Sequence, residues 1–161
     1  MNKLFITLLF TFMIIAASAQ TGLFNAKFGD TKQASIDNMI NEGFEISTND
    51  TNEVVMIPTD NYLIDSVTLN FSPDEDALIG WSVAYIPQDE DDIESIALEA
   101  VESWHGEDYV WDDNMEEYIW PLGEDKYVYA YYDYYYDFFF VQYTSGQKSD
   151  VSDDEEEYWD Y

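Results

Sequence analysis

Apolar residues in the first third of the chain recur every three to four positions, which is the spacing of a helix with one buried face. Residues 31–42 carry this pattern. Asp30 or Thr31 can cap the amino end of the segment, and Gly43 can end it. The sequence therefore predicts a first amphipathic helix over residues 31–42.

A second stretch with helical spacing covers residues 93–104, where apolar side chains again return every three to four positions. The acidic run 89–92 precedes it, and carboxylates are favourable at the positive end of a helix dipole. Gly106 can close the segment. We therefore expect a second amphipathic helix here.

Short apolar or alternating runs bounded by turn-forming residues predict strands. Three such runs follow each predicted helix, and turns rich in Asp, Asn and Pro separate them. The predicted strands are 52–58, 62–71 and 78–87 after the first helix, and 116–121, 126–132 and 137–143 after the second.

The two halves of the chain, about 23–87 and 88–145, thus share one order of elements, which predicts an internal repeat. This order favours an α+β fold in which two αβββ units form one antiparallel sheet, with the two helices packed on one face. We expect residues 20–148 to form a single domain, because a chain of this length can bury its own core.

The most conspicuous stretch is 126–143, which is dominated by tyrosine and phenylalanine. Alternation along its first strand sends Val128, Ala130 and Tyr132 to one face of the sheet and three other tyrosines to the opposite face. Core and cross-strand packing is the favoured interpretation, and a ligand platform is the alternative. An exposed tyrosine face would be the candidate contact surface, since rigid aromatic rings suit interfaces. The candidate binding residues are Tyr127, Tyr129, Tyr131, Tyr134 and Tyr136.

The chain opens with one lysine, an apolar run at 4–17 and small residues at 17–19. This arrangement is typical of a secretory signal peptide over residues 1–19. A run of about fourteen residues is short for a bilayer-spanning helix, which needs roughly twenty, so an uncleaved anchor is the less favoured alternative. We expect a bacterial protein exported to the periplasm or the extracellular space, with a mature chain that starts at Gln20 and does not insert into a membrane.

The charge is strongly one-sided, with 35 Asp and Glu against five Lys and a formal net charge of −30. Loss of Lys3 with the signal makes the mature chain one unit more negative. Such a field repels nucleic acid and anionic lipid, and it attracts cations and basic protein surfaces. A solubilising shell is the favoured interpretation of the carboxylates, and a specific cation site is the alternative.

The inventory of reactive side chains is short. The chain has no cysteine, which excludes a disulfide framework, a thiolate metal site and a cysteine nucleophile. The single histidine, His105, follows the second helix, where its ring can cap a terminal carbonyl. No G-x-S-x-G turn or Gly-rich phosphate loop is present. With so many carboxylates, an acid/base pair has no specificity, so we expect no enzyme, and an unrecognised hydrolase is the alternative.

Calcium is the one cofactor that the acidic segments suggest, because it needs several oxygen ligands at close spacing. The most loop-like acidic segment is 111–117, although it does not match the EF-hand pattern, and calcium would order the acidic stretch 107–117 around it. A solvated acidic loop is the favoured interpretation, and a calcium-dependent acidic secreted protein is the alternative. The candidate ligands are Asp112, Asp113, Asn114, Glu116 and Glu117.

The stretch FGDTKQASIDNMINEGFE at 28–45, together with the repeated helix-and-strands order, resembles the β-lactamase-inhibitor-protein-like architecture of small exported bacterial proteins. The resemblance covers about residues 23–145. It implies a binding module that contacts another envelope or secreted protein through its sheet face, without catalytic residues. This chain departs from the inhibitor in having no disulfides.

These observations lead to one functional hypothesis: an exported, non-enzymatic α+β module that binds an unknown protein or envelope component, not nucleic acid, through an aromatic sheet face. Residues 149–161 are almost entirely acidic or aromatic and predict a disordered tail. That tail is interpreted either as a further contact or as a solubiliser.

Overall fold

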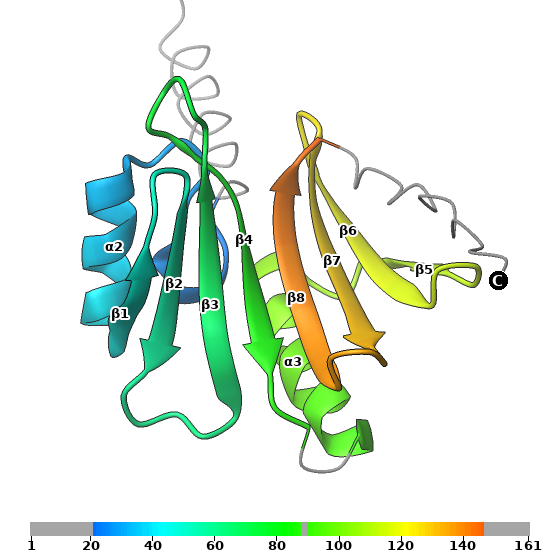
Figure 1. Cartoon of the computed structure of the whole chain (residues 1–161). Helices are drawn as coiled ribbons and strands as arrows, with labels where there is room; N and C mark the ends of the chain where they lie inside the picture. The colour runs from blue at the N-terminus through cyan, green and yellow to red at the C-terminus, as the bar shows by residue number, and fades with distance from the viewer. Residues whose placement is uncertain (1–20, 88–89, 147–161) are drawn as a thin grey trace, which may run out of the picture.

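The computed structural model describes residues 21–87 and 90–146, which form one eight-stranded antiparallel sheet with two α-helices (Figure 1). The predicted signal peptide and acidic tail lie outside the described residues. In chain order the elements are η1 (Leu23–Asn25), α2 (Lys32–Asn41), β1 (Phe44–Asn49), β2 (Glu53–Pro58), β3 (Ile64–Phe71), β4 (Leu78–Tyr85), α3 (Glu90–His105), β5 (Val110–Asp112), β6 (Glu117–Gly123), β7 (Lys126–Asp133) and β8 (Phe138–Ser145).

The α+β class and both helices are as predicted. Thr31 caps α2 by accepting a hydrogen bond from the backbone N–H of Ala34 at 3.3 Å. The strand order is β1-β2-β3-β4-β8-β7-β6-β5, so the last strand of each half pairs with the other at the centre of the sheet. Neither helix in the described part of the chain has the length and apolarity needed to cross a membrane.

Each helix is followed by four strands rather than the predicted three. The two strands that the sequence did not reveal, β1 and β5, are the edges of the sheet. In β1 every side chain after Phe44 is exposed, and β5 is only three residues long with none buried. Edge strands that bury little carry no apolar alternation, so the pattern that marks the other strands is missing from them.

One face of the sheet forms the core beneath the helices. Cross-strand neighbours make a continuous buried row through the five central strands, consisting of Met56, Val67, Val83, Val141 and Ala130. The helices add Ile36 and Met39 from α2, and Ile93, Ala97 and Val101 from α3. Both helices contact η1, which lies between them (Figure 1). The predicted alternation of β7 holds, because Val128 and Ala130 belong to this core.

The N-terminal segment docks on the same face, against an aromatic pair at the β4–β8 junction. Trp81 and Tyr143 are cross-strand partners whose rings stack with centroids 4.2 Å apart. The backbone N–H of Leu23 donates to the Tyr143 hydroxyl at 3.2 Å. A Cβ atom on Gly22 would lie 2.2 Å from the Tyr143 ring and 2.8 Å from the Trp81 ring. Only glycine therefore lets the chain approach the pair this closely.

Gly22→Ala should lower the free energy of unfolding by about 3 kcal/mol, because the added methyl must displace two packed rings. Gly29→Ala is the control: its Cβ meets nothing within 4 Å, and its left-handed φ of +86° costs about 1 kcal/mol. Urea unfolding of both variants measures the difference. Equal losses would contradict the docking of Gly22 beneath Tyr143.

Candidate functional site

Three turns at one end of the sheet, where β2, β5 and β7 finish, carry exposed aromatic and apolar side chains. These turns expose Tyr62, Met115, Tyr134, Tyr135 and Tyr136, each by more than half of its surface. We call this end the aromatic end. At the opposite end, the described turns 50–52, 72–77 and 124–125 expose no large apolar side chain. Tyr134, Tyr135 and Tyr136 are consecutive in one of these turns, and grouped exposed apolar surface marks interaction sites more often than scattered single residues do.

The β7–β8 turn presents its three tyrosines on an ordered backbone. The Asp133 carboxylate accepts hydrogen bonds from the backbone N–H groups of Tyr135 at 2.9 Å and Tyr136 at 3.1 Å. The Asp137 N–H closes the turn on the Asp133 carbonyl at 2.8 Å. Tyr134, Tyr135 and Tyr136 are 76%, 87% and 61% exposed. The rings are thus displayed to solvent by a turn that its own hydrogen bonds fix.

A pocket of about 260 Å³ lies beside this turn, on the helix side of the sheet. We call it the ring–carboxylate pocket. The Trp111 and Tyr118 rings lie 4.7 Å apart at 59°, and the Tyr132 and Tyr134 rings lie 5.0 Å apart at 58°. The residues that line it are Glu94, Trp111, Glu116, Tyr118, Tyr131, Tyr132, Tyr134 and Phe139.

Two tyrosine hydroxyls of this pocket donate to carboxylates, and the Tyr131 hydroxyl donates to the Gln142 amide oxygen at 3.4 Å. Tyr118 donates to Glu94 Oε1 at 2.7 Å, and this bond joins β6 to α3. Burial, with the Glu94 hydrogen bond and charge adding to it, raises the pKa of Tyr118 to about 12. The Tyr132 hydroxyl donates to the Asp137 carboxylate. The pocket therefore offers ring faces and carboxylate oxygens to a ligand.

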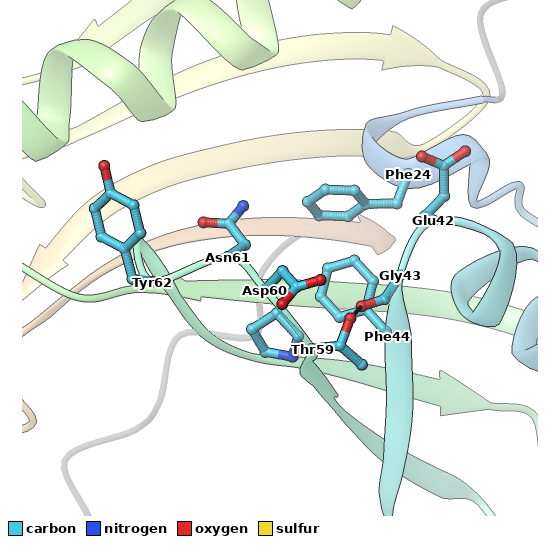
Figure 2. A pocket seen from close by; sticks show the side chains of 9 residues that line it. Phe24, Glu42, Gly43, Phe44, Thr59, Asp60, Asn61 and Tyr62 are labelled. Atoms are coloured by element: carbon cyan, nitrogen blue, oxygen red, sulfur yellow. Dashed lines mark hydrogen bonds between the residues drawn. The ribbon is translucent and has the colours of Figure 1, made fainter.

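A second and larger pocket, of about 510 Å³, lies between the end of α2 and the β2–β3 turn (Figure 2). We call it the β2–β3 pocket. Figure 2 shows the Phe24 ring on one side of it and Tyr62 at the other end. Phe24 has a left-handed φ of 61° and packs edge-on against Phe44 at 4.9 Å. Glu42 accepts a hydrogen bond from the Asn25 side chain at 2.6 Å. Neither pocket is lined by a lysine.

The five tyrosines predicted as a binding surface do not all lie on one surface, although Tyr131 and Tyr134 both line the ring–carboxylate pocket. Tyr127, Tyr129 and Tyr131 face away from the helices as expected, but Tyr129 is only 6% exposed and the other two are half-buried. Tyr131 stacks on Phe140 with ring centroids 5.8 Å apart, and burial raises its pKa to about 12. Tyr134 and Tyr136 lie beyond the strand in the turn, because the alternation of β7 ends at Asp133.

The predicted calcium ligands are also separated. Asp112 accepts hydrogen bonds from the backbone N–H groups of Asn114 and Met115, and Asp113 accepts one from the Trp111 indole at 2.7 Å. Glu117 is buried in β6, opposite Tyr131 in register, while Glu116 lines the ring–carboxylate pocket. Within the described residues, no three His, Asp or Glu side chains group in a way that could hold a metal ion.

Sequence reasoning missed Glu94, Trp111 and Tyr118 as site residues. Glu94 lies 24 positions before its partner Tyr118 and was assigned only to a helix. Trp111 stands in an edge strand too short to show alternation. The one local signal for this site in the sequence is the density of aromatic residues between 109 and 120.

His105 lies apart from both pockets and contacts the core. Its Nε2 atom is 3.2 Å from the Tyr143 hydroxyl, rather than on a helix carbonyl as predicted. The helix end is instead closed by the Gly106 N–H, which donates to the Glu102 carbonyl. The Tyr143 oxygen already accepts from Leu23, so its hydroxyl can donate to a neutral His105 ring. Burial lowers the pKa of His105, which is consistent with a neutral ring.

This arrangement predicts a pH dependence of stability. Because the folded pKa of His105 lies below its unfolded value of roughly 6.5, the unfolded chain binds more protons in the window below that value. The contribution of neutral His105 to the free energy of unfolding should be fully present above a pH of roughly 6.5. It should decrease as the pH falls below that value. His105→Gln keeps hydrogen-bonding capacity without titrating there. The difference in unfolding free energy between wild type and H105Q should therefore shrink on acidification. A constant difference from pH 8 to pH 4.5 would contradict the Tyr143–His105 contact.

Comparison with known proteins adds no relative to this description. The chain matches no protein-family model, no curated protein and no solved structure. The resemblance to the β-lactamase-inhibitor-protein-like architecture therefore stays an expectation, and function has to be inferred from the aromatic end and its pockets.

Proposed function

We propose that the chain is an exported, non-enzymatic binding module that contacts an envelope or extracellular protein through its aromatic end. The observation that carries this proposal is the β7–β8 turn, which exposes three successive tyrosine rings. These rings add nothing to the core, and their backbone is fixed before any partner arrives. Rigid tyrosines bury large area at low entropic cost, which is why they are common in protein-binding surfaces.

Charge favours a basic partner surface. The chain carries a formal charge of −30, and both pockets at the aromatic end combine aromatic rings with carboxylates. A positive partner would be drawn to the chain by the long-range field and would meet complementary charge in both pockets at the aromatic end. An acidic protein, nucleic acid or an anionic lipid surface would be repelled.

The tyrosine face of β7 is a weaker candidate than the turn. Tyr129 would have to leave a buried position to contact a partner, whereas Tyr135 and Tyr136 already stand in solvent. The role of a binding module also agrees with the expected resemblance to inhibitor-like exported proteins. We also propose that the chain consists of two repeated units. The strand order, which is mirrored about the β4–β8 junction, supports this.

Replacing Tyr135 and Tyr136 together by Ser should abolish capture of the partner without unfolding the domain. Both rings are exposed and contact each other edge-to-face at 4.9 Å, and neither lines the ring–carboxylate pocket. The immobilised mature chain and the variant would be exposed to a detergent extract of the native cell envelope. Quantitative mass spectrometry would then compare the retained proteins.

The matched control is Ile46→Ser combined with Ile79→Ser, which removes two partly exposed apolar side chains from outside the aromatic-end turns. Its melting temperature and that of the tyrosine variant should both stay close to wild type. A protein retained by wild type and by the control, but lost from the tyrosine variant, supports the proposal. Equal retention by all three chains would refute the aromatic end as the contact.

A further inference from the structure

We infer that the ring–carboxylate pocket receives the primary ammonium group of a lysine side chain from the partner. This inference rests on the proposed function and names the chemical group that the partner would insert. It concerns the walls formed by Trp111, Tyr118, Tyr132 and Tyr134 and the carboxylates of Glu94 and Glu116.

The first support is the arrangement of the rings. The Trp111–Tyr118 pair and the Tyr132–Tyr134 pair are inclined at 59° and 58°, so their faces form angled walls rather than one flat platform. The negative face of an aromatic ring attracts a cation within about 6 Å, and tryptophan and tyrosine are the strongest of the aromatic partners. Rings from different strands can thus surround one ammonium group and its methylene stem.

The second support is the supply of hydrogen-bond donors and acceptors. The Tyr118 and Tyr132 hydroxyls donate to Glu94 and Asp137, respectively. The pocket carries no lysine, and the chain has no arginine. Glu94 uses Oε1 to accept from Tyr118, and each carboxylate oxygen can accept more than one hydrogen bond. A ligand that brings N–H donors and positive charge complements this lining, whereas an anion would face Glu94 and Glu116.

These acceptors distinguish a primary ammonium from a quaternary one. A lysine ammonium has three N–H donors for the carboxylates, while a quaternary ammonium has none. The cavity of about 260 Å³ opens beside the exposed β7–β8 turn, so a side chain from a protein docked on that turn can enter it. In the β2–β3 pocket, by contrast, no tryptophan is among the lining residues, and the Phe24 and Phe44 rings pack edge-on against each other.

The test is an NMR titration of the ¹⁵N-labelled mature chain with Nα-acetyl-lysine-N-methylamide. The indole N–H of Trp111 reports on the ring–carboxylate pocket, and the backbone N–H of Gly43 reports on the β2–β3 pocket. The norleucine analogue keeps the carbon chain without the ammonium, and choline supplies a quaternary ammonium. We expect saturable shifts centred on Trp111 with the lysine probe, and binding at least about tenfold weaker with norleucine and with choline.

Two double variants distinguish the effect of the pocket carboxylates on lysine binding from the effect of the net charge of the chain. Glu94→Gln with Glu116→Gln removes two charges from the pocket and leaves Tyr118 an amide oxygen to donate to. Asp74→Asn with Glu75→Gln removes the same charge from the turn at the opposite end. Affinity for the lysine probe should fall about tenfold in the first variant and change by less than about twofold in the second. Trp111→Leu, a third variant, should weaken binding similarly while Glu94 and Glu116 remain, with the backbone N–H of Tyr118 as the reporter in place of the lost indole.

Several results would overturn the inference. Norleucine or choline binding as tightly as lysine would exclude recognition of a primary ammonium, and shifts centred on Gly43 would move the site to the β2–β3 pocket. Equal losses in the two charge variants would reduce the effect to the field of the whole chain. If lysine fails to bind but the Tyr135→Ser/Tyr136→Ser variant still loses the partner, the pocket inference fails and the proposed function stands. If lysine binds but that variant retains the partner, the proposed contact surface fails.

Discussion

The stacked pair of Trp81 and Tyr143 is the contact on which the rest of the fold depends. It lies where β4 meets β8, and these two strands join the halves of the sheet. The same two rings form the surface on which Gly22 and Leu23 dock, and Tyr143 also contacts His105 at the end of α3. One aromatic pair thus joins the two halves, the N-terminal segment and the second helix.

The helix α3 connects the Trp81–Tyr143 pair to the candidate site. Its carboxyl end is held by His105 on Tyr143 of β8, and Glu94, near its amino end, bonds to Tyr118 of β6. The helix therefore spans neighbouring strands of the second half and brings a carboxylate to the aromatic end. Without this anchoring, Glu94 would be one more solvated acid on a helix surface. The chemistry of the pocket follows from the packing of the core.

Carboxylates serve several different purposes in this acidic chain. Asp112 and Asp133 accept backbone N–H groups and order the β5–β6 and β7–β8 turns. Glu94 and Glu116 contribute negative charge to a pocket lined by rings. Exposed acids such as Asp74 and Glu75 lie in a turn without exposed apolar neighbours and fit the predicted solubilising shell. The charge of the chain is predominantly negative, but local hydrogen bonding decides what each carboxylate does.

Local pattern in the sequence determined the elements that bury a face. The helices α2 and α3 and the alternation of β7 could be predicted from residue order alone. In each of these elements the spacing of apolar residues marks the face that is buried. The edge strands β1 and β5 bury almost nothing, so no local pattern marked them. The candidate site was decided only in the tertiary structure. Glu94 meets Tyr118 across 24 residues, and whether Tyr129 is buried while Tyr135 is exposed depends on strand pairing. Residue order sets which side chains alternate, but long-range packing sets which of them a partner can reach.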